Sequence, residues 1–261
     1  MSFTTIRIDT DERGVATLAL ARPDKHNAMS SAMITELGEA AARIAGDARI
    51  RVVVLTGEGE SFCAGGDLGW MREQAAATRA QRMEEARKLA RALRALNELP
   101  KPVIGKVNGQ SYGGGMGLIS VCDVAIAADQ AKFGFTEVRL GLIPATISPY
   151  CLARMGEGRA RRVFFSGRIF GAGEAHELGL IARAVPADEL DDAVEAEIKP
   201  YLAASVQAVA SAKALARRLG PVIDDDLMED TVTRLADCWE TTDMAEGVAA
   251  FFEKRKPAWQ K

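Results

Sequence analysis

Two short apolar segments, at 52–55 and 103–107, are separated by a long amphipathic stretch, and this pattern constrains the fold most. Apolar side chains on both faces of a segment are typical of strands that helices cover on both sides. The stretch at 71–99 has apolar residues at helical spacing and ends at Pro100. A strand, a helix and a second strand in this order predict a right-handed crossover between parallel strands. The chain is therefore predicted to be an α/β protein.

The segments on either side extend this pattern. Alternating residues at 5–9 and 15–20, joined by a turn-forming sequence, predict an opening hairpin. We expect a helix over 30–45, capped by Ser30 or Ser31, and a further short strand over 124–127.

The carboxyl-terminal region, from Asp188 onward, is nearly all helical in its pattern, with expected breaks at Pro200 and at Gly220-Pro221. No internal repeat, low-complexity tract or flexible linker separates this region from the rest of the chain. We therefore expect it to pack on the body of the protein or on another subunit.

The composition excludes several classes of protein. Lysine and arginine number 33 and aspartate and glutamate 36, a net charge of −3 over 261 residues, so we expect neither nucleic acid nor a membrane as partner. No apolar stretch approaches the roughly 20 residues that cross a bilayer, and the first residues lack a signal-peptide pattern. The 4 cysteines are widely spaced and the histidines number only 2, which indicates buried thiols and no metal site. We expect a cytoplasmic protein.

Two glycine clusters follow the buried strands, at 61–68 and at 108–117. Sites in α/β proteins lie where strands end, and glycine allows a ligand to approach the backbone closely. One free N–H from each cluster could stabilise an oxyanion. The alternative is that both clusters are tight turns chosen for packing. Neither cluster matches the dinucleotide or P-loop fingerprint.

The second cluster also contains a G-x-S-x-G pattern, centred on Ser111, which is typical of a hydrolase nucleophile. Such a serine needs a histidine after it in the chain. His176 is the only one, and its helical surroundings favour an ordinary surface residue. We therefore disfavour a serine hydrolase.

Glu137 lies in a largely apolar segment, 133–144. Removal from water would raise the pKa of its carboxyl and suit it to proton transfer. The alternative is a structural ion pair with Arg139 or another nearby basic residue.

Five segments of the chain resemble, in order, the motifs of the enoyl-CoA hydratase/isomerase family, also called the crotonase family. They are 22–29, 62–67, 113–115, 133–144 and 246–255. In that family the first is a coenzyme A loop, the next two form an oxyanion hole, the fourth carries a catalytic glutamate and the last belongs to the carboxyl-terminal helix. The resemblance implies an α/β fold with a spiral of ββα turns over residues 1–200. It also implies a helical oligomerisation region over 201–261 that builds homotrimers, usually paired as hexamers.

The resemblance further implies which residues form the site. The N–H groups of Gly66 and Gly114 would hold the carbonyl of an acyl-CoA thioester, and Glu137 would transfer protons. Other substrate contacts would come from Lys25, Ala28, Ala64, Gly65, Asp67, Leu68, Gly117, Phe251 and Lys254. For Lys254 the alternative is an ordinary solvated residue. No separate cofactor is implied, because coenzyme A is part of the substrate.

One position departs from the family pattern. The hydratases carry a first catalytic glutamate where this chain has Gly117, and 144–149 replaces a glycine-rich run. The segment 138–149 is most similar to the branch that hydrates 3-methylglutaconyl-CoA and its isohexenyl relatives in leucine and terpene breakdown. We expect the space beside Gly117 to admit the distal carboxylate of such a substrate, an anion or a water.

Three functions stay open on this basis. We favour a hydratase that adds water to an α,β-unsaturated acyl-CoA of methylglutaconyl type through an enolate that the oxyanion hole stabilises. The alternative is an isomerase that moves one proton with Glu137 alone. The third is a catalytically silent coenzyme A-binding scaffold, which would not need Gly66, Gly114 and Glu137 together.

Overall fold

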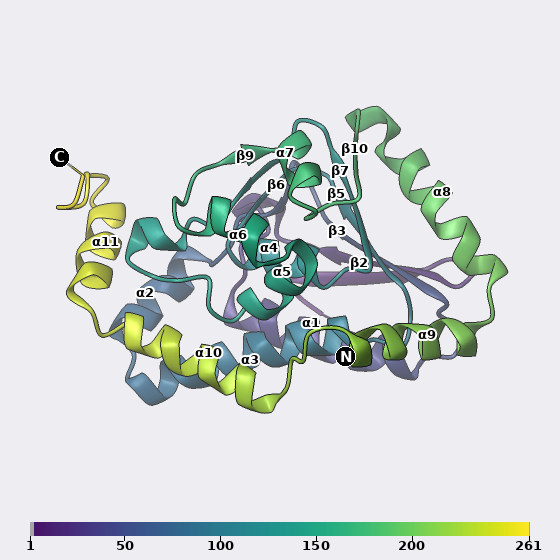
Figure 1. The fold of residues 1–261 in the computed structure, drawn as a ribbon, viewed down its shortest axis with the longest axis horizontal. Helices are drawn as coiled ribbons and strands as arrows, with labels where there is room; N and C mark the ends of the chain where they lie inside the picture. Colours follow the sequence, from purple (N-terminus) through teal and green to yellow (C-terminus); the bar gives the residue numbers. More distant parts are fainter. Residues whose placement is uncertain (1–2, 261) are drawn as a thin grey trace.

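The computed structural model describes residues 3–260. Met1, Ser2 and Lys261, at the ends of the expected regions 1–200 and 201–261, lie outside the described residues. A six-stranded sheet with the order β1-β2-β3-β5-β7-β10 forms the body of the fold (Figure 1). Its strands are β1 (Ile6–Thr10), β2 (Val15–Leu20), β3 (Val52–Gly57), β5 (Val103–Val107), β7 (Val124–Ala128) and β10 (Arg183–Val185). β1 and β2 are antiparallel, and all other neighbouring pairs are parallel. The predicted hairpin, strands and α/β class are thereby confirmed.

A second, four-stranded sheet has the order β4-β6-β8-β9. Its strands are β4 (Ser61–Cys63), β6 (Gln110–Tyr112), β8 (Lys132–Gly134) and β9 (Phe170–Gly171). The first three each follow a strand of the large sheet and precede a helix, which is the ββα repeat that the resemblance implied. The hydrophobic pattern did not predict this sheet, because strands of two or three residues are too short to show alternation.

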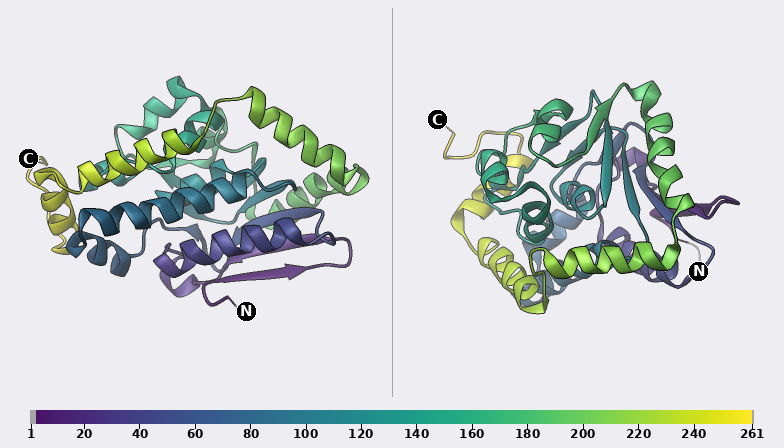
Figure 2. Two further views of the ribbon diagram at one scale, coloured as in Figure 1. Left: turned by 90° about the horizontal axis from the view of Figure 1, so that it is seen from below. Right: turned by 45° about the vertical axis from the view of Figure 1, so that its right-hand side comes forward.

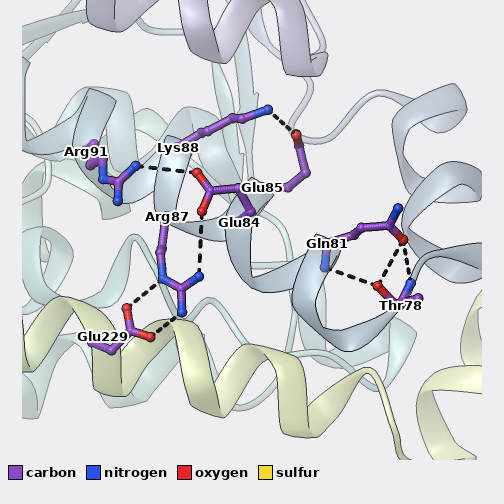
Figure 3. Close-up of polar contacts among 8 residues, drawn as sticks. All are labelled: Thr78, Gln81, Glu84, Glu85, Arg87, Lys88, Arg91 and Glu229. Atoms are coloured by element: carbon purple, nitrogen blue, oxygen red, sulfur yellow. Dashed lines mark hydrogen bonds and ion pairs between the residues drawn. The ribbon is translucent and has the colours of Figure 1, made fainter.

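The first helices explain how the chain reaches the glycine clusters. α1 (Ser31–Gly46) confirms the predicted helix, and its cap is Ser30, whose side chain accepts a hydrogen bond from the Met33 N–H at 3.3 Å. The prediction of one helix over 71–99 is wrong, because the chain forms α2 (Leu68–Ala76) and α3 (Arg79–Asn97). Thr78 separates them, since its side chain and that of Gln81 form a capping box that starts α3 (Figure 3).

The carboxyl-terminal region is helical, as predicted, with α8 (Leu190–Ala203), α9 (Val206–Leu219), α10 (Asp225–Cys238) and α11 (Thr242–Phe252). Pro200 lies inside α8, so the predicted break there is wrong. Ile198 and Tyr201 on either side of it pack against the sheet, and this packing offsets the hydrogen bond that a proline cannot donate. Gly220-Pro221 does separate α9 from α10. The other elements are η1 (Pro23–Lys25), α4 (Gly114–Ser120), η2 (Glu137–Leu140), α5 (Ser148–Met155), α6 (Glu157–Phe164), α7 (Ala172–Glu177) and η3 (Ala187–Glu189).

Helices cover both faces of the large sheet. Successive residues of β3 point to opposite faces, so Val53 packs in the core with α1 and α3, whereas Val54 packs against α8. Figures 1 and 2 show α8 along one side of the molecule and α10 lying beside α3. An ion pair of 2.5 Å between Arg87 and Glu229 joins these two helices (Figure 3). Among the helices of the described residues, none has the length and apolar composition that a bilayer crossing would take.

Candidate active site

A cavity of about 470 Å³ opens where the two glycine loops, η2 and the carboxyl-terminal helices meet. Seven of the residues expected in the site lie in its wall: Ala64, Gly65, Gly66, Leu68, Gly114, Glu137 and Phe251. The rest of the wall is mainly apolar, with side chains from α2, α10 and the segment 140–147. A mainly apolar wall with a few polar groups is typical of a small-molecule site.

The two glycine loops and Glu137 are in direct contact. Gly65 has a φ of +91°, and a Cβ built on it would lie 3.1 Å from the Tyr112 carbonyl oxygen and 3.8 Å from the Gly113 Cα. Gly113 has a φ of +50°, and a Cβ there would lie 3.3 Å from Glu137 Oε1. Glycine is required at both positions, because they combine a left-handed backbone with a close approach. The three segments that the sequence singled out therefore converge on one site.

Two backbone N–H groups are directed away from their own loops. Met29 and Gly66 form a parallel bridge in which the Met29 N–H donates to the Gly65 oxygen at 2.7 Å and the Asp67 N–H donates to the Met29 oxygen at 3.0 Å. In such a bridge the N–H of Gly66 points to the opposite side. Gly114 is the first residue of α4, so its N–H has no acceptor within the helix. Both glycines line the cavity, where the two donors can stabilise an oxyanion.

Glu137 is the first residue of η2 and the only acidic residue among those that line the cavity. Burial raises the pKa of its carboxyl to about 7. Its Oε2 is buried and has no hydrogen-bond partner among the described residues. The alternative of an ion pair with Arg139 is therefore not observed, and the carboxyl can take up or release a proton near neutral pH.

Gly117 does not line the cavity, and the expectation of open space beside it is wrong. A Cβ at this position would lie 2.5 Å from Cγ2 of Ile147 and 3.4 Å from Cδ1 of Leu93. Ile147 itself lies in the cavity wall. An apolar side chain thus fills the volume that a second carboxylate, a substrate carboxylate or a water was expected to occupy.

Four other expected residues also lie outside the cavity wall. Asp67 caps α2, accepting hydrogen bonds from the Gly69 and Trp70 N–H groups, and pairs with Arg22 at 3.0 Å. Arg22 also donates to the Ala28 carbonyl oxygen at 2.7 Å, so Asp67 and Ala28 hold the loops together. Lys25 in η1 and Lys254 after α11 are both exposed, away from the wall.

Two tryptophans in the wall were not singled out from the sequence. Trp70 comes from α2 and Trp239 follows α10. Arg82 of α3 ties them together, since it donates to the Gln74 oxygen of α2 at 2.8 Å and to the Trp239 oxygen at 3.5 Å. Its guanidinium also lies 5.4 Å from the centre of the Trp239 ring. Trp70 and Trp239 lie among apolar residues with the spacing of any helix that packs on a core. The sequence therefore did not indicate that their rings face a cavity.

The serine hydrolase alternative fails on burial. Ser111 is fully buried, and its Oγ has no hydrogen-bond partner among the described residues. His176 is exposed and its Nδ1 lies 3.4 Å from the Ile181 carbonyl oxygen. Ser111 therefore has neither a substrate in reach nor a base.

The family model described as enoyl-CoA hydratase/isomerase matches residues 10–261. The chain belongs to the enoyl-CoA hydratase/isomerase family. Relatives within this family include the crotonyl-CoA hydratase of Syntrophomonas wolfei, 32% identical over 98% of both chains. The short-chain-enoyl-CoA hydratase of Clostridium acetobutylicum is 34% identical over 94% of both chains. An enoyl-CoA hydratase structure from Shewanella pealeana is 38% identical, with a TM-score of 0.81 over 98% of this chain and 96% of that one. The crotonase fold of this enzyme family is thereby confirmed.

Proposed function

We propose that the chain is an enoyl-CoA hydratase in which Glu137 is the only proton-transferring side chain. One observation carries the proposal: a single buried carboxyl with a pKa of about 7 lines the same cavity as Gly66 and Gly114, whose N–H groups have no acceptor within their own loops. The relatives named above as hydratases support the choice of reaction. A silent scaffold would not need these three groups together.

The proposed mechanism places the thioester carbonyl between the Gly66 and Gly114 N–H groups. Their hydrogen bonds stabilise the negative charge that reaches the oxygen when a nucleophile adds to the β-carbon. Glu137 in its ionised form takes a proton from a water, and the hydroxide that remains bonds to the β-carbon. The enolate then collapses and its α-carbon takes the proton from Glu137. One carboxyl thus delivers both parts of the water, and its pKa near neutrality suits both steps.

A second candidate is an enoyl-CoA isomerase, and the contact between Gly117 and Ile147 favours it. Moving a double bond needs one group that removes a proton from one carbon and returns it to another. Because Ile147 fills the place beside Gly117, no second carboxylate is positioned there to hold a water. Glu137 alone suffices for this reaction.

For the acyl group we propose the glutaconyl class that the sequence suggests. Arg139 supports it, because it is the only basic residue among those that line the cavity and no ion pair engages it within the described part of the chain. A guanidinium can bind a carboxylate through two hydrogen bonds. Contacts of Lys25, Phe251 and Lys254 with coenzyme A belong to the same proposal.

We also propose a homotrimer or a hexamer. The support is an apolar surface along the outer side of α9 and the turn after it. The exposed fractions are 58% for Leu215, 77% for Leu219 and 65% for Val222. A second copy of the chain would cover this surface.

The experiment that tests the reaction uses water labelled with ¹⁸O. Purified enzyme is incubated separately with crotonyl-CoA, 3-methylglutaconyl-CoA and a 3-enoyl-CoA, and the masses of the products are measured by mass spectrometry. The Glu137→Gln variant, treated in the same way, is the control for catalysis by Glu137. A hydratase yields a labelled β-hydroxyacyl-CoA, fastest from the glutaconyl thioester. Migration of the double bond without label in any product would replace the first proposal by the second. No reaction with any thioester would refute both.

A further inference from the structure

The indole of Trp70 reaches from the oxyanion loop to α3. A Cβ built on Gly66 would lie 3.5 Å from Trp70 Cζ3 and 3.6 Å from Cε3, so the benzene edge of the indole borders the proposed oxyanion donor. At its other end, Trp70 Nε1 donates a hydrogen bond of 3.1 Å to Glu85 Oε2. The ring lines the cavity beside the place where the acyl group would begin.

Glu85 is itself fixed in position. Lys88, one turn further along α3, donates to Glu85 Oε1 at 2.6 Å (Figure 3). The Glu85 carboxyl therefore has one oxygen on Lys88 and the other on Trp70. Burial acts to raise its pKa, but the hydrogen bonds from Lys88, Trp70 and Ser31 outweigh it, so the pKa is lowered and the carboxylate stays ionised.

Only one of the two neighbouring glutamates of α3 is placed in this way. Glu84, the preceding residue, pairs with Arg87 at 3.6 Å and with Arg91 at 3.4 Å on the outer surface (Figure 3). Its side chain is 50% exposed, against 15% for Glu85. Exposed ion pairs such as those of Glu84 contribute little beyond solubility. The buried position of Glu85 beside the indole indicates a different role for it.

We propose that Trp70 is the specificity-determining wall for the part of the acyl chain next to the thioester, and that Glu85 is a positioning residue that locks the indole over Gly66. The wall admits acyl groups that carry no branch at their α-carbon, as in the proposed glutaconyl class, and rejects those with a branch there. This inference rests on the proposed function, because it assumes that an acyl thioester occupies the cavity.

The physical basis is the number of ways in which an indole can turn. A tryptophan has two side-chain torsions, and without its N–H partner the ring can swing into the cavity or away from the loop. The charged acceptor Glu85 removes that freedom with a hydrogen bond that is stronger than one between neutral groups. A fixed wall discriminates between acyl groups by about 10-fold or more for each misplaced carbon, whereas a movable wall yields.

The first test observes the indole directly. Protein labelled with 5-fluorotryptophan has three ¹⁹F resonances, for Trp70, Trp239 and Trp259, and Trp70→Phe assigns one of them. We expect the Trp70 resonance to shift on binding of butyryl-CoA, which cannot react. In Glu85→Ala this resonance should broaden or move in the free protein, and in Glu85→Gln, which keeps an acceptor, it should remain near its original position. The matched control is Glu84→Ala, which should leave all three resonances unchanged.

The second test measures selectivity with the same variants. The ratio of kcat/KM for an α-branched enoyl-CoA to that for crotonyl-CoA should rise about 10-fold in Glu85→Ala, change little in Glu85→Gln and remain constant in Glu84→Ala. An unchanged Trp70 resonance and ratio in folded Glu85→Ala, or equal changes in Glu84→Ala, would overturn the inference. If the unaltered enzyme acts on no enoyl-CoA, the proposed function fails, and the resonance comparison with butyryl-CoA still decides whether Glu85 positions the indole.

Discussion

Ile147 occupies the volume beside Gly117, with its Cγ2 only 2.5 Å from the point where a Cβ on Gly117 would lie. The two residues come from α4 and from the turn before α5, and both are buried. The residue at one position therefore limits the residue at the other, because only glycine at 117 leaves room for a β-branched residue at 147. Ile147, an apolar wall residue, thus stands where the resemblance placed a second acidic group.

Gly117→Ala should lower the free energy of unfolding. Alanine favours a helix over glycine by about 0.5–1 kcal/mol, but forcing a methyl group into a filled core costs about 1–3 kcal/mol, so the clash decides the sign. Ile147→Ala alone should cost about 2–5 kcal/mol. The double variant should be more stable than the sum of the two single effects by at least about 0.5 kcal/mol. Denaturant unfolding measures all four proteins, and strict additivity would contradict the packing described here.

Gly66 offers a matched pair of variants that test the oxyanion donor. A Cβ at this position makes only ordinary contacts with Trp70, so Gly66→Ala keeps the N–H and should retain activity within a few-fold. Gly66→Pro removes the N–H and should lower kcat by about 10²–10³-fold. Circular dichroism checks that both variants fold. Gly114 is less suitable for this test, because a Cβ there would lie 1.8 Å from Met29 Cε. Equal activity in folded alanine and proline variants would remove Gly66 from the site.

Glu137→Gln keeps the size of the side chain and removes its proton transfer. We expect a loss of at least about 10²-fold in kcat with nearly unchanged affinity for butyryl-CoA, measured by calorimetry. In the unaltered enzyme the carboxyl must be ionised to act as a base, so kcat/KM should fall as the pH falls below about 7, the pKa of Glu137. A flat profile between pH 5 and 8 would show that another group transfers the proton.

The same raised pKa predicts how stability depends on pH. Glu137 titrates near pH 7 in the folded protein and near 4.5 in the unfolded chain. Between these values the folded protein holds a proton that the unfolded chain has released, so the free energy of unfolding falls as the pH rises through this window. Glu137→Gln has no such group. Its stability relative to the unaltered protein should therefore increase from pH 4.5 to 7 and then level off, as chemical denaturation at each pH can check.

Ser111→Ala should stabilise the protein without affecting catalysis. The hydroxyl is buried and has no partner among the described residues, so its removal should raise the free energy of unfolding by about 1 kcal/mol. Activity should stay within a few-fold. A folded Ser111→Ala protein without activity would bring back the hydrolase alternative that burial excludes.

Long periodic segments of this chain could be predicted, and short or tertiary features could not. The strands at 52–55 and 103–107 have both faces apolar, which leaves few other interpretations. The break between α2 and α3 was missed although Thr78 and Gln81 carry the capping-box signature, because the apolar stripe that predicted the helix lies wholly within α3 and does not show where that helix begins. Pro200 was assigned a break that packing against the sheet overrides.

The site divides in the same way. Gly66, Gly114 and Glu137 lie in motifs, and the structure brings all three to one cavity. Ile147 beside Gly117 could not be foreseen, since nothing in the sequence states which side chain enters the space that a glycine leaves. Trp239 follows α10, far along the chain, and reaches the cavity only through the packing of α10 on α3.

Arg82 of α3 couples two walls of the cavity. Its guanidinium donates hydrogen bonds to the end of α2 and to the residue that follows α10, so the wall that carries Trp70 and the wall that carries Trp239 are joined through α3. An acyl group that displaces one of these walls must also displace the other, because both are hydrogen-bonded to Arg82. Tolerance for acyl size should then end at a threshold, above which larger thioesters are all excluded rather than bound with gradually falling affinity.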